Sequence, residues 1–353
     1  MYVSAVSKGA APRHAPTHHS AAESRWRHAA RIAPGLLLAM ALAGAAFALH
    51  CLPGIGSFSP MIISVLLGIA FHNLVGTPAR AGAGIVFSLK RLLRVAIVLL
   101  GLQLTVQQIA AVGLAGLAVV AASLVATFVV TIWAARFTGV ERRLATLIAA
   151  GTSICGASAV VAINAVTEAP DEDVAYAVAC VTVFGSIAMF LYPALPGLLH
   201  LGPRAYGLWA GASIHEIAQV VAAAFQAGPE AGHDAAIAKL TRVTLLAPTV
   251  IALGLLATRR QGKPGAKRRP PVPYFVLGFV ALVTVNSLVT IPAAEKHWIV
   301  LGTTFLLSLA LAAMGLETDI RKLRAKGLRP LLLGAISWLF IAGFSLILVA
   351  VTS

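Results

Sequence analysis

Long apolar runs separated by short polar connections are the dominant pattern of this chain. A helix needs about 20 apolar residues to cross the hydrocarbon core of a bilayer, and many runs approach that length. We place eleven membrane segments at residues 32–50, 60–77, 91–106, 113–135, 142–166, 174–198, 204–227, 238–257, 273–292, 298–315 and 328–352. The pattern therefore predicts an all-α polytopic membrane protein.

Composition agrees with this prediction and excludes an ordinary soluble domain. The 353 residues are 59% hydrophobic and 11% charged, whereas soluble domains carry about 25% charged residues. The mean hydropathy is +0.90. The three cysteines, Cys51, Cys155 and Cys180, form no CxxC pair, so the sequence indicates neither a disulfide framework nor a metal site.

The first 31 residues differ from the rest of the chain. They are rich in Ala, His and Arg and lack hydrophobic periodicity, which predicts a disordered basic tail. The run at 32–50 follows several arginines, as the apolar part of a signal peptide does. Because it is long enough to span a bilayer and more segments follow, we interpret it as an uncleaved first helix. Residues 32–353 then form one transmembrane domain.

The net charge of +15 is concentrated in alternate connections. If the tail is cytoplasmic, all of the 27 lysines and arginines lie on the cytoplasmic side except Arg204, Lys239, Arg242 and Lys296. Cytoplasmic loops of membrane proteins are enriched in Lys and Arg, so we expect a cytoplasmic N-terminus and a C-terminus outside. Because the basic residues flank apolar segments and form no stripe among aromatic residues, a nucleic-acid partner is not expected.

Internal similarity relates distant parts of the chain. Residues 101–117 and 315–331 share six identities in seventeen positions, and 60–73 correspond to 273–286. These matches pair the second to fourth segments with the ninth to eleventh, in opposite orientations. Another match, six identities in twelve positions, joins 151–162 (GTSICGASAVVA) to 211–222 (GASIHEIAQVVA).

The two matches agree in orientation only if the fifth and seventh segments do not cross the membrane. If both segments cross, the match of 151–162 with 211–222 relates parallel copies, whereas the matches of 60–73 and 101–117 with 273–286 and 315–331 relate inverted copies. Re-entrant hairpins at 142–166 and 204–227 make both matches inverted, in two permuted repeats at about 60–198 and 204–352. Broken, crossing helices are the alternative, which the charges near Glu168 and Arg204 slightly favour. Either geometry interrupts the helix at the motif.

Both motifs contain small and hydroxyl residues suited to a small oxyanion. An interrupted helix exposes backbone N–H groups at the start of its second half, where the helix dipole adds partial positive charge. Glycine permits close backbone approach, and hydroxyl groups add donors. The alternative is that these small residues only pack helices tightly. We expect the substrate-binding residues to be Gly151, Thr152, Ser153, Gly156, Ser158, Gly211 and Ser213.

The second motif contains the only carboxylate well inside an apolar segment. Glu216 follows His215, and Gln219 lies one turn later. Because an intramembrane charge costs about 3 kcal/mol or more, we interpret His215, Glu216 and Gln219 as an ion-coupling group. Glu216 or His215 could exchange a proton, or Glu216 with Gln219 could hold a cation. The structural alternative is a buried Glu216 satisfied by Ser, Gln or Arg242.

Several motifs together resemble a known family. The stretches GTSICGASAVVAI, DVAYAVACVTVFGSIAMFLYP, GASIHEIAQVVAA, KLTRVTLLAP and LAAMGLETDIRKLRAKGLRPLLLGAISWLF are similar to those of the sulfate exporter family of YeiH-like bacterial inner-membrane proteins. The resemblance runs from about residue 32 to the C-terminus. It implies a transporter of the bacterial inner membrane. The interrupted segments also resemble the cation-antiporter and bile-acid-transporter assemblage, in architecture only.

These observations together predict a secondary transporter whose two inverted repeats meet near the bilayer midplane. We expect it to export a small anion, sulfate or a sulfonate, coupled to protons or sodium. The alternatives are a monovalent cation/proton antiporter, in which Glu216 binds the cation, and a non-transporting scaffold or sensor.

No enzymatic role is expected. No GxSxG, Walker, HExxH or paired-carboxylate pattern occurs in the chain, so we predict no catalytic residue, no cofactor and no metal. The expected partners are the anion, the coupling ion and the lipid bilayer. A homodimer is left open.

Overall fold

The computed structural model describes residues 21–52, 58–261, 274–289, 291–318 and 327–352, and all regular structure in these ranges is helical. Within these ranges, six helices are by length and composition long and apolar enough to cross a membrane: Ala29–His50, Val112–Thr138, Asp171–Ala194, Pro229–Leu253, Ala293–Glu317 and Leu328–Thr352. Shorter apolar helices cover Pro60–Leu74, Ala157–Thr167, Ile217–Gln226 and Tyr274–Leu288. The all-α membrane class is confirmed, with fewer full-length helices than the eleven segments expected.

The first helix begins earlier than the sequence predicts. Helix α1 (Ala21–His50) includes eleven residues of the expected disordered tail. This part of the chain is rich in alanine and arginine, which have high helix propensity. Residues 1–20 lie outside the described residues, so disorder there stays a prediction.

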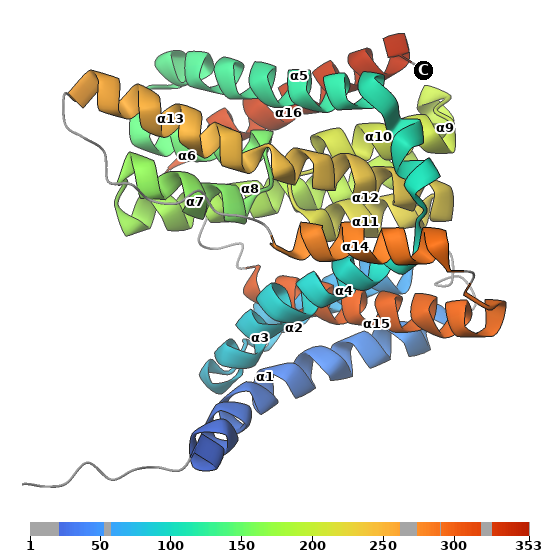
Figure 1. Ribbon diagram of the computed structural model, residues 1–353. Coiled ribbons are helices and arrows are strands. Elements are labelled where there is room, and N and C mark those ends of the chain that lie inside the picture. Colours follow the sequence, from blue (N-terminus) through green and yellow to red (C-terminus); the bar gives the residue numbers. More distant parts are fainter. Residues whose placement is uncertain (1–20, 53–57, 262–273, 290, 319–326, 353) are drawn as a thin grey trace, which may run out of the picture.

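The helices form two groups, one above the other in Figure 1. The lower group contains α1, α2 (Pro60–Leu74), α3 (Gly82–Phe87), α4 (Leu93–Leu100) and α15 (Ala293–Glu317). The upper group contains α5 (Val106–Thr138), α6 (Arg142–Ser153), α7 (Ala157–Thr167), α8 (Asp171–Leu191), α9 (Pro196–Leu199), α10 (Pro203–Ser213), α11 (Ile217–Gln226), α12 (Pro229–Thr244), α13 (Leu246–Gln261) and α16 (Leu328–Thr352). Helix α14 (Tyr274–Leu288) lies between the groups. Both motifs therefore belong to the upper group.

Short irregular helices connect some of these elements. They are the 3-10 turns η1 (Ala79–Ala81), η3 (Gly101–Gln103) and η4 (Tyr192–Ala194), and the π-helix η2 (Ser88–Leu92). Helix α5 bends at Gly113, whose φ of 62° is accessible to glycine at little cost. The bend is visible at the right of Figure 1.

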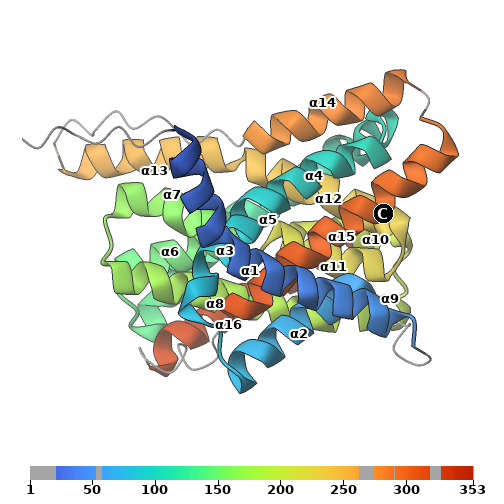
Figure 2. The same cartoon turned by 90° about the horizontal axis from the view of Figure 1, so that it is seen from below.

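The lower group is held together where α2 meets α15, which lie side by side in Figures 1 and 2. Two glycines let the backbones touch. A Cβ atom on Gly68 would lie 2.9 Å from the Cα of Gly315, and one on Gly315 would lie 2.4 Å from the carbonyl oxygen of Val65. Only glycine fits this crossing without moving a helix.

Replacing Gly315 with leucine is expected to separate α2 from α15. The new side chain would need space that the backbone of α2 fills, and overpacking of this kind costs about 1–3 kcal/mol or more. The melting temperature of the detergent-purified variant should fall clearly. Gly302→Leu is the matched control, because no atom lies within 4 Å of a Cβ built there. Equal melting temperatures for the two variants would contradict the packing role.

Two asparagine side chains close the ends of helices in the same manner. The Nδ2 of Asn73, at the end of α2, donates to the carbonyl oxygen of Thr318 over 3.1 Å. The Nδ2 of Asn286, at the end of α14, donates to the carbonyl oxygen of Leu104 over 2.7 Å. In the sequence match described above, Asn73 aligns with Asn286 and Leu104 aligns with Thr318. Aligned residues therefore make equivalent contacts.

Candidate functional site

The helix is interrupted within both motifs. Helix α6 ends at Ser153 and α7 begins at Ala157, and Gly156 between them has a φ of 68°. Helix α10 ends at Ser213 and α11 begins at Ile217, with Ile214 and Glu216 in extended conformation. We call residues 154–156 tip 1 and residues 214–216 tip 2.

Each interrupted segment folds back on itself. The Nη1 of Arg143, at the start of α6, donates to the carbonyl oxygen of Glu168 at the end of α7 over 3.0 Å. The hydroxyl of Tyr206, at the start of α10, donates to the carbonyl oxygen of Ala223 in α11 over 3.3 Å. A broken but crossing helix would hold these ends far apart. We call α6 with α7 hairpin 1, and α10 with α11 hairpin 2; they enter from opposite ends of the upper group (Figures 1 and 2).

Tip 2 packs onto tip 1 through Glu216. A Cβ atom on Gly156 would lie 2.5 Å from the Cγ of Glu216 and 3.1 Å from its Oε1. The same Oε1 accepts a hydrogen bond from the hydroxyl of Thr182 in α8 over 3.2 Å. Gly156 is therefore needed both for its positive φ and for the space that the Glu216 side chain fills.

Gln219 orders the backbone of tip 2. Its Oε1 accepts from the backbone N–H of Glu216 over 3.1 Å. Its Nε2 donates to the carbonyl oxygen of Thr182 over 3.0 Å and contacts the Oγ of Ser186 at 3.3 Å. The structure therefore brings Glu216 and Gln219 together, with α8 as an additional partner that sequence reasoning missed.

Two buried cations on α12 join the tips. Lys239 and Arg242 are both fully buried. The Nζ of Lys239 donates to the carbonyl oxygens of Ile154 over 3.1 Å and Ile214 over 2.7 Å. Arg242 donates from Nε to Ile154 over 2.7 Å, from Nη2 to Thr152 over 2.7 Å, and from Nη1 to Ala212. Each cation thus binds backbone of both hairpins.

These contacts satisfy groups that the interruptions set free. The last carbonyl groups of a helix lack an intrahelical partner and carry partial negative charge. Lys239 and Arg242 donate to such groups at the ends of α6 and α10. In the sequence analysis, both residues are among the four basic residues that do not lie on the cytoplasmic side. The signal available in the sequence is two cations one turn apart in an otherwise apolar segment.

The three predicted substrate-binding serines lie next to the tips, but their hydroxyl protons are already used. Ser153 donates to Ala149 over 2.6 Å, Ser213 to Trp209 over 2.6 Å, and Ser158 to Cys155 over 3.1 Å. Such bonds to the preceding turn are common for Ser in helices. These three serine hydroxyl groups therefore do not present free donors to a substrate in this conformation.

Two of the predicted glycines allow close helix packing, and the predicted threonine supplies a backbone carbonyl group. A Cβ atom on Gly151 would lie 2.7 Å from Val181, and one on Gly211 would lie 2.5 Å from the carbonyl oxygen of Ala235. Thr152 is buried, and its carbonyl oxygen is the acceptor for Arg242. The packing interpretation accounts for both glycines, and their role in substrate binding stays a prediction.

Among the three residues of the predicted coupling group, His215 has the fewest hydrogen bonds. The residue is fully buried, and neither ring nitrogen has a hydrogen-bond partner among the described residues. It lies within electrostatic range of Lys239 and Arg242. The structure therefore places it at the same centre as the tips and the cations.

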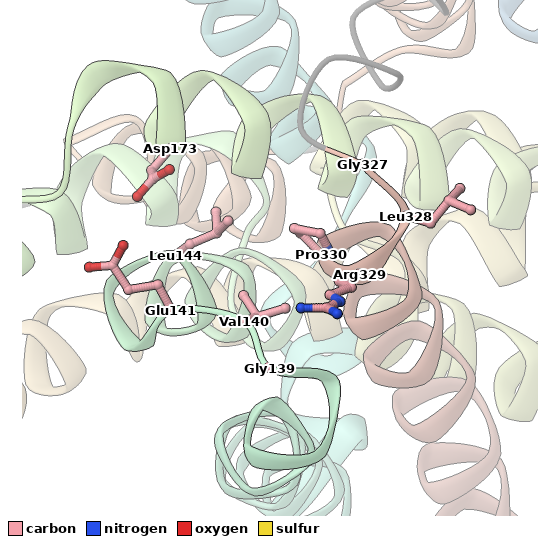
Figure 3. Close-up of a pocket in the computed structure, with 9 residues that line it drawn as sticks. All are labelled: Gly139, Val140, Glu141, Leu144, Asp173, Gly327, Leu328, Arg329 and Pro330. Carbon is pink, nitrogen blue, oxygen red and sulfur yellow. The ribbon is translucent and has the colours of Figure 1, made fainter.

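Two open pockets lie at the bases of the hairpins, away from the tips. One has a volume of about 450 Å³ and is lined by Gly139, Val140, Glu141, Leu144, Asp173 and 327–330. Figure 3 shows the carboxylates of Glu141 and Asp173 on one side of it and Arg329 on the other. The second, of about 500 Å³, is lined by Gln107, Gln108, Arg204, Glu230, His233 and Asp234. Neither pocket contains a predicted site residue.

Sequence comparisons identify the relatives of the chain. A family profile described as conserved hypothetical protein 698 matches residues 34–334. A UPF0324 membrane protein of Pseudomonas aeruginosa is 42% identical over 330 residues, covering 89% of this chain and 93% of the relative. A UPF0324 membrane protein of Bordetella pertussis is 39% identical over 328 residues, covering 90% and 94%.

A third relative carries the name that the sequence motifs suggest. The UPF0324 inner membrane protein YeiH of Salmonella typhi is 38% identical over 320 residues, covering 88% of this chain and 92% of the relative. No solved structure matches the chain. The chain therefore belongs to the UPF0324 family of YeiH-like membrane proteins.

Proposed function

We propose that the protein is a secondary transporter that exports a small anion, sulfate or a sulfonate, with proton or sodium coupling. The observation that carries this proposal is the meeting of two interrupted hairpins, from opposite ends of the bundle, at one buried pair of cations. Non-helical backbone in a membrane protein is tolerated where protein or a water-filled cavity surrounds it, and transporters use such breaks to bind ions. The tips are the substrate site.

Equivalent contacts support two inverted repeats. The carbonyl groups that Lys239 and Arg242 bind come in pairs sixty positions apart, Ile154 with Ile214 and Thr152 with Ala212. The matched contacts of Asn73 and Asn286 add a second pair in the other part of the repeat. Repeats of this kind exchange conformations to open the site to one side at a time.

The charges at the tips favour an anion over a cation as the main substrate. Lys239 and Arg242 both bind carbonyl groups at the two breaks, and Glu216 is the only carboxylate within residues 154–156 and 214–216. A cation substrate would add positive charge to this centre, whereas an anion would reduce it. The antiporter alternative keeps Glu216 as the cation ligand, and the scaffold alternative assigns all of these contacts to packing.

Flux into liposomes separates these functions. Purified protein should take up labelled sulfate when a pH or sodium gradient is imposed, and empty liposomes should not. Proton flux that requires sodium, without anion movement, would favour the antiporter instead. If no flux occurs across a wide range of ions and pH values, the result would favour the non-transporting scaffold.

The orientation of the chain is tested by labelling. We propose a cytoplasmic N-terminus, which places the base of hairpin 1 inside and the base of hairpin 2 outside. In a cysteine-free background, Glu168→Cys should react with a membrane-impermeant maleimide only from the cytoplasmic side. Arg204→Cys should react only from the opposite side. Labelling of both positions from the same side would contradict this topology.

A further inference from the structure

Two exposed cations on the lower group have no ion pair among the described residues. Lys90 lies in η2 and Arg94 in the first turn of α4, and both side chains are exposed. Neither forms an ion pair within the described part of the chain. No Asp or Glu occurs at residues 24–140 or 235–294. The helices that carry these cations, and the adjoining α14, therefore supply no carboxylate to balance their charge.

The two cations share one row with an exposed apolar residue. Val86, Lys90 and Arg94 follow one another at intervals of four residues, which places them on one face of the helix. Arg91 lies about a quarter turn to the side of this row. Like charges at this spacing repel each other, so an anion that contacts both Lys90 and Arg94 would relieve the repulsion. The side chain of Val86 is 40% exposed, so the row is amphipathic.

Helix α14 extends this surface, because it packs beside α4 (Figures 1 and 2). The guanidinium group of Arg94 lies 6.0 Å from the centre of the Phe275 ring, within the range of a cation–π contact. Tyr274, at the start of α14, is 75% exposed. Exposed tyrosines of membrane proteins concentrate at the depth of the lipid headgroups. The ring of Tyr274 therefore indicates that Arg94 lies at headgroup depth.

The surface becomes apolar with distance from the cations. A Cβ atom on Gly278 would lie 3.1 Å from the side chain of Val98. Together with the contact of Arg94 with Phe275, this shows that α4 and α14 run in the same direction. Leu277 and Val280 of α14 are exposed and lie farther along that direction. Charges at one end and apolar side chains beyond them fit an amphiphile better than a free phosphate ion.

We propose that Lys90 and Arg94, with Tyr274, bind the phosphodiester headgroup of an anionic phospholipid whose acyl chains lie along the exposed face of α14. With the cytoplasmic N-terminus proposed above, this surface belongs to the cytoplasmic leaflet, where basic residues next to membrane helices attract anionic lipids. The site lies outside both hairpins and does not depend on which ion the protein transports.

Binding of phosphatidylglycerol to the detergent-purified protein, followed by native mass spectrometry, tests this site. A cation at the membrane surface contributes on the order of fivefold to the affinity for an anionic lipid. The double variant with Lys90→Gln and Arg94→Gln should therefore bind phosphatidylglycerol about 25-fold more weakly. Phosphatidylcholine, which has no net charge, should bind the unmodified protein and the variant equally. Unchanged binding of phosphatidylglycerol in the folded double variant would overturn the proposal.

The matched control removes two exposed cations from the upper group, with Arg136→Gln and Arg142→Gln. This variant should bind phosphatidylglycerol like the unmodified protein. Equal weakening in both double variants would indicate attraction by net charge alone and would overturn the site. Displacement of the lipid by millimolar inorganic phosphate would assign the cations to a soluble anion instead. If the first double variant does not fold, Lys90→Gln alone decides, with an expected loss of about fivefold.

Discussion

Replacing Arg242 with alanine is expected to unfold the centre of the protein and abolish transport. The guanidinium group donates to the carbonyl groups of Thr152, Ile154 and Ala212 from inside the bundle. Removing it leaves backbone acceptors of both hairpins without this partner, and each unsatisfied buried group costs about 1–3 kcal/mol. The loss of stability should reach about 3–5 kcal/mol, which is typical when one partner of a buried charged network is removed.

Thermal melting in detergent measures this effect, together with sulfate flux in liposomes. Arg91→Ala is the matched control, because Arg91 is exposed on the surface of η2. The control should melt near the temperature of the unmodified protein. If Arg242→Ala melts at the same temperature as Arg91→Ala and still transports, the tips are not held by this residue.

Replacing Glu216 with glutamine is expected to uncouple transport without unfolding the protein. Glutamine has nearly the same shape and keeps an oxygen that can accept from the hydroxyl of Thr182. It cannot take up or release a proton near neutral pH. Sulfate flux should continue down its own gradient, and an imposed pH gradient should no longer drive it.

The measurement is the ratio of sulfate uptake with and without a pH gradient. We expect a ratio several times larger than one for the unmodified protein and close to one for Glu216→Gln. Glu295→Gln serves as the control, because Glu295 is exposed in the first turn of α15. A wild-type ratio in Glu216→Gln would place the coupling ion elsewhere.

The position of the two interruptions could be predicted from the sequence. The motifs at Gly151 and Gly211 repeat, and both expected geometries interrupt the helix at them. The parity argument favours hairpins at these positions, whereas the charges near Glu168 and Arg204 slightly favour broken, crossing helices, so the sequence leaves both geometries open. The structure agrees with the hairpins at their bases, where Arg143 and Tyr206 bridge the two arms.

The cations that join the tips could not be predicted in the same way. The predicted eighth segment begins at residue 238, after the polar residues Glu230, His233 and Asp234, whereas α12 starts at Pro229. Lys239 and Arg242 therefore lie several turns inside a helix. Their partners are backbone carbonyl groups, which every residue has, so no residue type in the sequence identifies them.

The serines show a related difference between sequence and structure. A hydroxyl group in a motif indicates a donor, but the sequence does not say which acceptor is nearest. In helices α6 and α10 the preceding turn supplies that acceptor for Ser153 and Ser213. Local geometry, which depends on where each helix ends, decides between a bond to substrate and a bond to backbone.

The long separation between tip 1 and its cations has a consequence for biosynthesis. Arg242 follows Ile154 by 88 residues, so the ribosome completes hairpin 1 well before the partner of its carbonyl group exists. A free carbonyl group is costly in lipid. Hairpin 1 is therefore expected to stay hydrated at the insertion machinery until α12 has been synthesised, and truncation before residue 239 should leave it sensitive to protease.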